Sequence, residues 1–206
     1  IVLLFTLLAF TPQQKKKITV WLIGDSTMSI KDPRAYPETG WGMPFVYFFD
    51  TTVKIDNRAK NGRSTKSFRA EKLWQPVLDN MQEGDYVLIQ FGHNDQNKQK
   101  PELYALPDEY RQNLMQYVHE VKAKRGIPVL ITPVSRRRFK DGQQVETHVG
   151  YSPEVKEVAD EMDAFYIDLD TKSRELYQQM GEETSKLLFL HLKAGEHPNY
   201  PEGKED

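Results

Sequence analysis

Residues 18–26 read ITVWLIGDS, an apolar run that ends in a glycine, a carboxylate and a hydroxyl. A continuous apolar run of this length is typical of a strand that is buried on both faces of a parallel sheet. An ordinary turn after such a strand would need only residues that favour turn geometry. Asp25 and Ser26 instead indicate that the end of this strand carries chemistry.

The same rhythm repeats along the chain, where short apolar runs alternate with amphipathic segments. The first helix is expected to have Ser67 as N-cap and a kink or offset start at Pro76, the second to end at Gly126, and the last to break near Gly181. This alternation predicts an α/β fold, a three-layer, doubly wound parallel sheet of about five strands, flavodoxin-like. We expect strands at 17–24, 53–59, 84–92, 127–134 and 164–170, and helices at 67–81, 107–126, 152–163 and 169–190.

Polar residues follow four of these strands, in the segments 24–26, 59–64, 92–95 and 132–138. The carboxyl ends of parallel strands meet at one edge of a sheet, and ligands bind there. A site at this edge is therefore expected. No G-x-G-x-x-G or P-loop pattern follows the first strand, which argues against a dinucleotide or nucleotide cofactor.

The composition narrows the function classes. The 28 basic and 30 acidic residues give a net charge of −2 without a long basic block, which argues against a nucleic-acid partner. The chain has no cysteine, so disulfides and thiolate chemistry are excluded. No cluster of residues calls for a metal, and no cofactor is expected.

The first 16 residues differ from the rest. Residues 1–10 are uncharged and too short to span a bilayer, which takes about 20 residues as a helix. They resemble the apolar part of a signal peptide, although a first core strand is the alternative. We therefore expect 1–16 to be the remnant of a signal peptide with a linker, 17–206 to form one domain, and the mature protein to be secreted or periplasmic, with no membrane segment.

Three short motifs together carry a family resemblance. GDST at 24–27, NGRST at 61–65 and GHND at 92–95 resemble the first three blocks of the SGNH (GDSL-like) hydrolases. The segment ITPVSRRRF at 131–139 and the segments 147–181 and 186–206 resemble the rhamnogalacturonan acetylesterase branch of that family. The resemblance covers nearly the whole chain from Lys17 onward. It implies a serine esterase that removes acetyl groups from a pectic polysaccharide of the plant cell wall.

By this resemblance, Ser26 is the nucleophile. The oxyanion donors are the backbone N–H groups of Ser26 and Gly62 and the side-chain amide of Asn94. Asp25 is expected to organise the serine turn through hydrogen bonds. Taken singly, these residues also suit an N-cap pair, a turn and a cap, so the joint pattern carries the interpretation.

The resembled family takes its base from a late Asp-x-x-His motif. Asp206 stands where the Asp of that motif is expected, and no histidine follows it. We therefore expect a sequence cut at both ends, and much slower ester hydrolysis by the 206 residues than by a chain extended through that histidine. His197 is the alternative base, and His93 is expected to be structural or to contact substrate.

Several residues are candidates for substrate contacts. The arginines at 136–138 are suited to bidentate contacts with galacturonate carboxylates, and a solvated run of charge is the other interpretation. His148 belongs to a loop that the family uses near its substrate, with an ordinary surface position as the alternative. Three aromatic residues are candidates for stacking on sugar rings, or else for the core: Trp41, Tyr151 and Tyr200. The three arginines of the run are Arg136, Arg137 and Arg138.

Two other functions stay open. The same architecture serves lysophospholipases and thioesterases, which a preference for long acyl chains would reveal. A non-catalytic carbohydrate-binding protein on a degenerate hydrolase fold is the second alternative.

Overall fold

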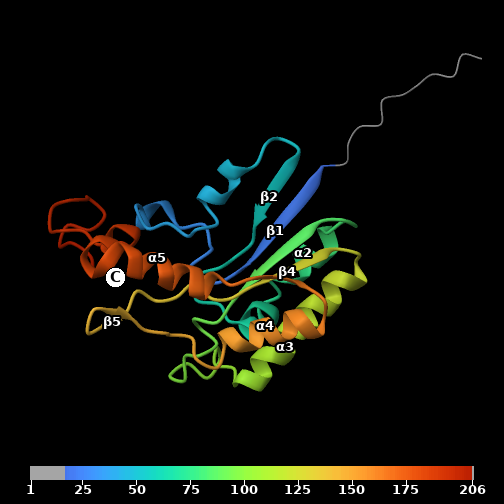
Figure 1. Cartoon of the computed structure of the whole chain (residues 1–206). Coiled ribbons are helices and arrows are strands. Elements are labelled where there is room, and N and C mark those ends of the chain that lie inside the picture. The colour runs from blue at the N-terminus through green and yellow to red at the C-terminus, as the bar shows by residue number, and fades with distance from the viewer. Residues whose placement is uncertain (1–16, 206) are drawn as a thin grey trace, which may run out of the picture.

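A parallel sheet of five strands forms the centre of the molecule (Figure 1). The computed structural model describes residues 17–205, so the expected leader at 1–16 and Asp206 lie outside the described residues. The order across the sheet is β2-β1-β3-β4-β7, and every neighbouring pair is parallel. The strands are β1 (Ile18–Gly24), β2 (Val53–Asn57), β3 (Tyr86–Gln90), β4 (Ile127–Ile131) and β7 (Phe165–Ile167).

This strand order confirms the predicted doubly wound sheet. From β1 the chain moves outward to β2, then returns past β1 to β3 and continues in the other direction. The connections therefore diverge between β1 and β3, which is where open α/β sheets bind ligands. Ser26 follows β1, and Asn94 follows β3, so the strand order brings both to this point.

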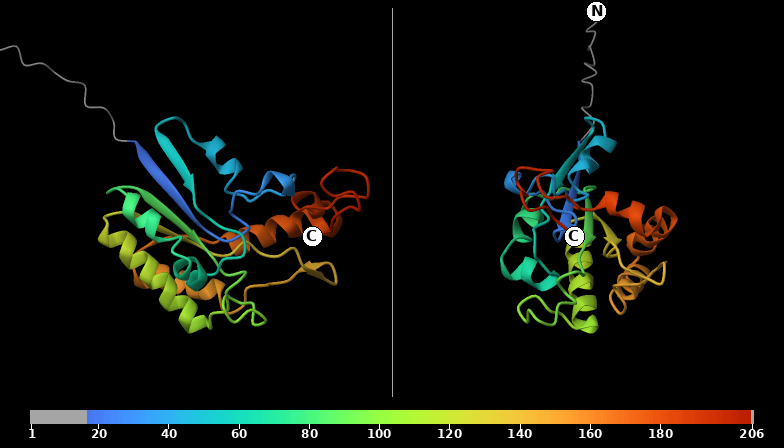
Figure 2. Two further views of the ribbon diagram at one scale, coloured as in Figure 1. Left: turned by 180° about the vertical axis from the view of Figure 1, so that it is seen from behind. Right: turned by 90° about the vertical axis from the view of Figure 1, so that its left-hand side faces the viewer.

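Helices cover both faces of the sheet. Trp21, Ile23, Val87 and Ile89 point to one face, where a large core forms with α1 to α4. Val20 and Leu22 point to the other, against Trp41, Phe45 and the start of α5; Figure 2 shows α5 on the opposite side from α1 and α2. The helices are α1 (Thr65–Ala70), α2 (Gln75–Asn80), α3 (Pro107–Ala123), α4 (Ser152–Glu161) and α5 (Leu169–Thr184).

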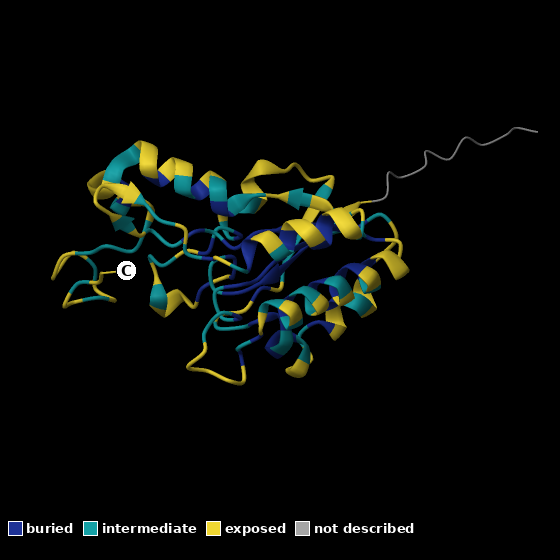
Figure 3. Cartoon of the chain, turned by 60° about the horizontal axis from the view of Figure 1, so that its bottom comes forward, coloured by how far each residue is buried: buried dark blue, intermediate teal, exposed yellow. Residues whose placement is uncertain are grey.

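The burial pattern follows from these two layers. Central strands are buried along most of their length, whereas each helix exposes its outer face, as Figure 3 shows. β1 is buried from Val20 to Gly24, which explains its unbroken apolar sequence. Among residues 17–205, no helix combines the length and apolar character needed to cross a membrane.

Three helix boundaries differ from the sequence-based expectation. The N-cap of α1 is Ser64, and Ser67 occupies the third helical position, so the two serines form a capping box. Pro76 lies in the first turn of a separate helix, α2, because its ring suits a helix start. Arg125, with φ 59°, takes the left-handed position after α3 that was expected of Gly126. Gly181 does interrupt α5, with φ 78°.

The remaining elements are short. An antiparallel hairpin joins β5 (Phe139–Lys140) to β6 (Gln143–Gln144) after β4. Three 3-10 helices are η1 (Pro33–Ala35), η2 (Pro44–Phe48) and η3 (Ser185–Leu188). The first two lie in the long connection between β1 and β2, which contributes one wall of the site described next.

Candidate active site

Ser26 lies in a tight turn directly after β1. The turn begins at Asp25, whose carbonyl accepts hydrogen bonds from the N–H groups of Met28 (3.3 Å) and Ser29 (3.1 Å). Ser26 is half-buried, whereas the side chains of Asp25 and Met28 in the same turn are fully buried. A hydroxyl at the end of a buried strand is thus held by fixed backbone while one side of it faces a cavity.

Asp25 holds this turn from inside. Its Oδ1 accepts hydrogen bonds from the N–H (3.0 Å) and the hydroxyl (2.8 Å) of Thr27, and its side chain is fully buried. The Thr27 hydroxyl in turn accepts from Gln90 Nε2 (2.8 Å), and Gln90 Oε1 accepts from the indole of Trp41 (2.6 Å). This chain of bonds joins the serine turn to the end of β3 and to the β1–β2 connection.

Gly62 lies in the turn after β2. Arg63 N–H donates to the carbonyl of Lys60 (3.3 Å), which closes the turn with Gly62 at φ 73°. That left-handed conformation favours glycine. A Cβ at Gly62 would meet nothing within 4 Å, so this side of the turn faces open space that a ligand can enter.

Asn94 completes the expected set of oxyanion donors. Its Nδ2 donates to the carbonyl of Arg63 (2.9 Å), so the amide is fixed against the residue that follows Gly62. Because an amide nitrogen carries two protons, one stays for another acceptor. The loops after β2 and β3 therefore lie together, as the three motifs predicted.

A cavity of about 650 Å³ adjoins Ser26. Its walls come from the β1–β2 connection on one side and from the segment after α5 on the other. The cavity has apolar walls at Trp41 and Leu187–Leu190 and polar groups near Ser26. Its lining includes Ser26, Lys31, Glu38, Trp41, Tyr177 and His191.

His93 and His148 pack against each other beside the site, with ring centroids 4.5 Å apart. Burial lowers the pKa of both imidazoles, that of His148 to about 2, so both are neutral near pH 7. His148 is fully buried. The surface position weighed for it is therefore wrong, and no face of its ring is open to a substrate.

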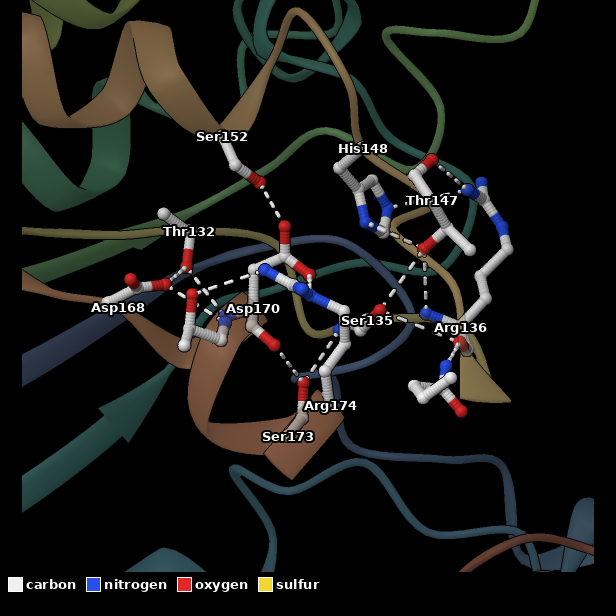
Figure 4. Close-up of polar contacts among 12 residues, drawn as sticks. Thr132, Ser135, Arg136, Thr147, His148, Ser152, Asp168, Asp170, Ser173 and Arg174 are labelled. Carbon is white, nitrogen blue, oxygen red and sulfur yellow. Dashed lines mark hydrogen bonds and ion pairs between the residues drawn. The ribbon is translucent and has the colours of Figure 1, made fainter. Parts of the chain in front are cut away.

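Arg136 and Arg137 are held by the protein. Arg136 Nη1 donates to the carbonyl of Thr147 (3.3 Å) and lies 3.4 Å from His148 Nε2 (Figure 4). Arg137 Nε donates to the hydroxyl of Ser185 (2.9 Å). Both guanidinium groups thus brace loops around the site, and Arg138 is the exposed member of the three.

A buried polar cluster anchors the segment that carries these arginines (Figure 4). Ser135 N–H donates to the hydroxyl of Ser173 (2.9 Å), and the Asp170 N–H donates to the hydroxyl of Thr132 (2.8 Å). Ser152 donates to Asp170 Oδ2 (2.6 Å). The loop after β4 is therefore fixed to the first turn of α5 and to the start of α4.

The three aromatic candidates have different surroundings. Tyr151 is only 6% exposed, and its hydroxyl donates to the carbonyl of Ala105 (2.7 Å), so the expected sugar-stacking role is corrected to one in the core. Tyr200 is half-buried and donates to the carbonyl of Ala35 (2.8 Å). Trp41 alone among them lines the cavity beside Ser26.

None of the histidines among residues 17–205 forms a hydrogen bond with the Ser26 hydroxyl that would mark it as the general base. Among residues 17–205, no side chain hydrogen-bonds the Ser26 hydroxyl. His197 packs against the rings of Tyr36 and Tyr200 and is not part of the cavity lining. His191 does line the cavity, and its Nε2 has no partner among the described residues. Its sequence context, LFLHL, contained no motif that marked it.

Metal ligation has no candidate in the described part of the chain. Residues 17–205 contain no group of three or more His, Asp or Glu side chains placed to hold an ion. What the arrangement does offer is the Ser26 hydroxyl at the wall of a cavity, and a hydrogen bond from the Asn94 amide that joins its loop to the turn of Gly62. That combination suits acyl transfer, in which negative charge develops on a carbonyl oxygen.

Known proteins are similar to this chain in sequence. A family profile described as "GDSL-like Lipase/Acylhydrolase family" matches residues 22–199. The rhamnogalacturonan acetylesterase RhgT of Bacillus subtilis is 42% identical over 193 residues, which are 93% of this chain and 82% of RhgT. The probable rhamnogalacturonan acetylesterase YesY of the same organism is 34% identical over 83% of this chain and 79% of its own.

Solved structures agree on the fold. Protein YxiM of Bacillus subtilis superimposes with a TM-score of 0.76 at 26% identity, over 84% of this chain and 49% of that one. Axe2, an acetylxylan esterase of Geobacillus stearothermophilus, superimposes with a TM-score of 0.58 at 22% identity, over 79% of this chain and 82% of its own. The second likeness concerns the fold alone.

Proposed function

Because this chain belongs to the GDSL-like lipase/acylhydrolase family, we propose that it is a serine esterase that removes O-acetyl groups from a rhamnogalacturonan-type pectic polysaccharide. The observation that carries the proposal is that hydrogen bonds join the turns of Ser26, Gly62 and Asn94 in a chain that is 42% identical to a rhamnogalacturonan acetylesterase. Acetylated plant cell-wall polysaccharide is then the partner.

The reaction follows from the residues that meet there. The Ser26 hydroxyl attacks the acetyl carbonyl, and the N–H groups of Ser26 and Gly62 and the Asn94 amide stabilise the oxyanion. Collapse of this intermediate releases the sugar hydroxyl and leaves Ser26 acetylated; water then repeats the attack and frees acetate. By the family pattern, a histidine oriented by Asp206 would carry out the proton transfers. Asp206 lies outside the described residues.

The test is acetate release from acetylated rhamnogalacturonan by the enzyme as its gene encodes it. We expect release by the wild type and none above background by Ser26→Ala, whose fold is checked by circular dichroism. Binding of the polysaccharide by both proteins without any release would instead favour a carbohydrate-binding protein.

Acyl-chain preference separates the other enzyme classes. Aryl acetate, butyrate and octanoate are compared by kcat/KM, and we expect the acetate to be preferred. Preference for octanoate would contradict the proposal and favour a lysophospholipase or thioesterase, since apolar side chains such as Leu187 and Phe189 line one wall of the cavity.

We also propose that the protein is secreted or periplasmic. The support is the apolar, uncharged sequence of residues 1–10, which suits a signal peptide, and the extracellular nature of the proposed substrate. Expression of the whole gene in its host, followed by detection in medium and periplasm, tests this. Detection only inside the cell would contradict it.

A further inference from the structure

A buried lysine lies under the nucleophile turn, outside the three family motifs. Lys31 follows Ser26 by five positions, and it is only 8% exposed. Its ammonium lies within hydrogen-bond distance of three oxygens: the carbonyl of Ser26 (2.6 Å), Oδ1 of Asn61 (3.2 Å) and Oε1 of Glu38 (2.7 Å). No feature of the sequence marked this residue.

The three contacts use the whole donor capacity of the side chain. An ammonium has three N–H donors and no acceptor. All three are directed at protein oxygens, so none is left for a substrate. Any influence of Lys31 on the reaction must therefore pass through the groups that it holds.

Two of those oxygens belong to the proposed oxyanion donors or to a neighbour of one: the first to Ser26 and the second to Asn61. Ser26 supplies its own N–H, and Lys31 holds the carbonyl of that same residue. Asn61 precedes Gly62, and its side-chain oxygen also accepts a short hydrogen bond from the hydroxyl of Ser29. Lys31 and Ser29 thus fasten the turn after β1 to the turn after β2 through the side chain of Asn61.

Glu38 makes the burial of this cation possible. An unpaired buried ammonium carries a large desolvation cost, which a close carboxylate offsets. The Glu38 side chain is 34% exposed at the cavity wall, so it pairs with Lys31 while it stays partly hydrated. The pair is therefore a built feature of the site rather than a surface contact.

We infer that Lys31 is a positioning residue that sets the distance between the N–H groups of Ser26 and Gly62. The inference rests on the proposed function, which makes these two groups oxyanion donors. Displacement of a catalytic group by about 1 Å can reduce a rate about 100-fold. Loss of the ammonium leaves the Ser29 hydroxyl as the remaining donor shared by the Ser26 carbonyl and Asn61 Oδ1, so the link between the two turns is weakened.

The first variant is Lys31→Met, which keeps an unbranched side chain and removes the donors. We expect kcat on an aryl acetate, per active site titrated with a fluorophosphonate, to fall about 10- to 100-fold with little change in KM. Hydrogen exchange should accelerate about 10-fold at residues 26–29 and 61–63 together. Lys156→Met, which removes an exposed lysine paired with Asp160, is the matched control and should change neither quantity.

Rescue distinguishes positioning from simple loss of packing. The 206 residues contain no cysteine, so Lys31→Cys introduces a single thiol into them. Its thiolate displaces bromide from 2-bromoethylamine, and the new S–C bond yields a lysine analogue with an ammonium at the same reach. Alkylation should restore at least half of the lost kcat, whereas iodoacetamide, which adds a neutral amide, should not.

The outcomes separate this inference from the proposed function. If Ser26→Ala hydrolyses esters like the wild type, the proposed function fails, and hydrogen exchange still decides whether Lys31 couples the two turns. If Ser26→Ala is inactive but Lys31→Met keeps the wild-type kcat and exchange, the inference alone is overturned. If Lys31→Met does not fold, the exposed Asn61→Ala breaks the same link from its other end and should lower kcat in the same way.

Discussion

Asp95 Oδ1 accepts two hydrogen bonds from Thr65, one from its N–H (2.9 Å) and one from its hydroxyl (2.5 Å). The carboxylate therefore joins the loop after β3 to the first turn of α1, one residue after Asn94. Asp95 is fully buried, and burial raises its pKa to about 7. The same residue thus supports the site and makes its stability depend on pH.

Asp95→Asn should remove a pH-dependent loss of stability. Between its unfolded pKa of 3.8 and about 7, Asp95 is ionised in the unfolded chain and protonated in the folded one. The free energy of unfolding of the wild type should therefore fall as pH rises through this range, by an amount on the order of 4 kcal/mol, and stay level above it. Urea unfolding from pH 4 to pH 8 measures this, and Asp95→Asn should lack that decline.

Asp50 offers a matched control of opposite sign. It accepts the same pair of bonds from Thr52 at the surface (2.8 and 2.5 Å), and these bonds lower its pKa. Its contribution to stability is present above its unfolded pKa and is lost as pH falls through its folded pKa. Asp50→Asn should therefore differ from the wild type at neutral pH and converge with it in acid. Parallel pH profiles for the Asp95 and Asp50 variants would contradict both assignments.

Asn94→Ala should slow the chemical step. The variant loses an oxyanion donor, so kcat should fall about 100- to 1000-fold. KM should change little, because the interaction is made mainly in the transition state. Steady-state kinetics on an aryl acetate provide the measurement, and Asn80→Ala on the far helix α2 is the control. Wild-type kcat in Asn94→Ala would remove this residue from the mechanism.

Gln90→Leu should destabilise the protein. Gln90 is fully buried, and its replacement deprives Trp41 Nε1 of an acceptor and the Thr27 hydroxyl of a donor. Both groups are half-buried, so the total cost should be about 1–3 kcal/mol. Denaturant unfolding checks it against Gln112→Leu, an exposed position on α3. Equal stability of the two variants would show that this chain of hydrogen bonds carries little energy.

Arg138→Ala tests contact with the uronate. Arg136 and Arg137 are held by backbone carbonyls and Ser185, so the exposed Arg138 is the member of the run suited to an anionic polymer. We expect KM on acetylated rhamnogalacturonan to rise about 3- to 10-fold, as for the loss of one charged contact, without a change on an aryl acetate. Lys124→Ala, beyond the end of α3, is the control. Equal effects on both substrates would exclude this role.

The fold could be predicted because its pattern is local. β1 is one unbroken apolar run, and Gly181 interrupts α5 as its sequence indicated. The hairpin of β5 and β6 could not, since its strands have two residues each and show no periodicity. Ser64 and Ser67 are both good caps, and only the fold selects Ser64.

The site shows the same division. GDST, NGRST and GHND allowed Ser26, Gly62 and Asn94 to be predicted as site residues because they are contiguous motifs at strand ends. His148 and Tyr151 were misplaced, since their burial comes from His93, Arg136 and Ala105, which belong to other loops. The sequence did not single out Lys31, and it suggested for His191 only a position at a helix end, because the groups around both residues are distant in sequence and their neighbours form no motif.

The order of the strands also decides when this protein becomes an enzyme. Ser26, Gly62 and Asn94 follow β1, β2 and β3, and β1 lies between the other two. The three residues do not all come together until β1 has paired with both neighbours, however early a local element such as α3 forms. In a refolding experiment, the return of the proposed esterase activity would therefore report when β1 has paired in register with both β2 and β3.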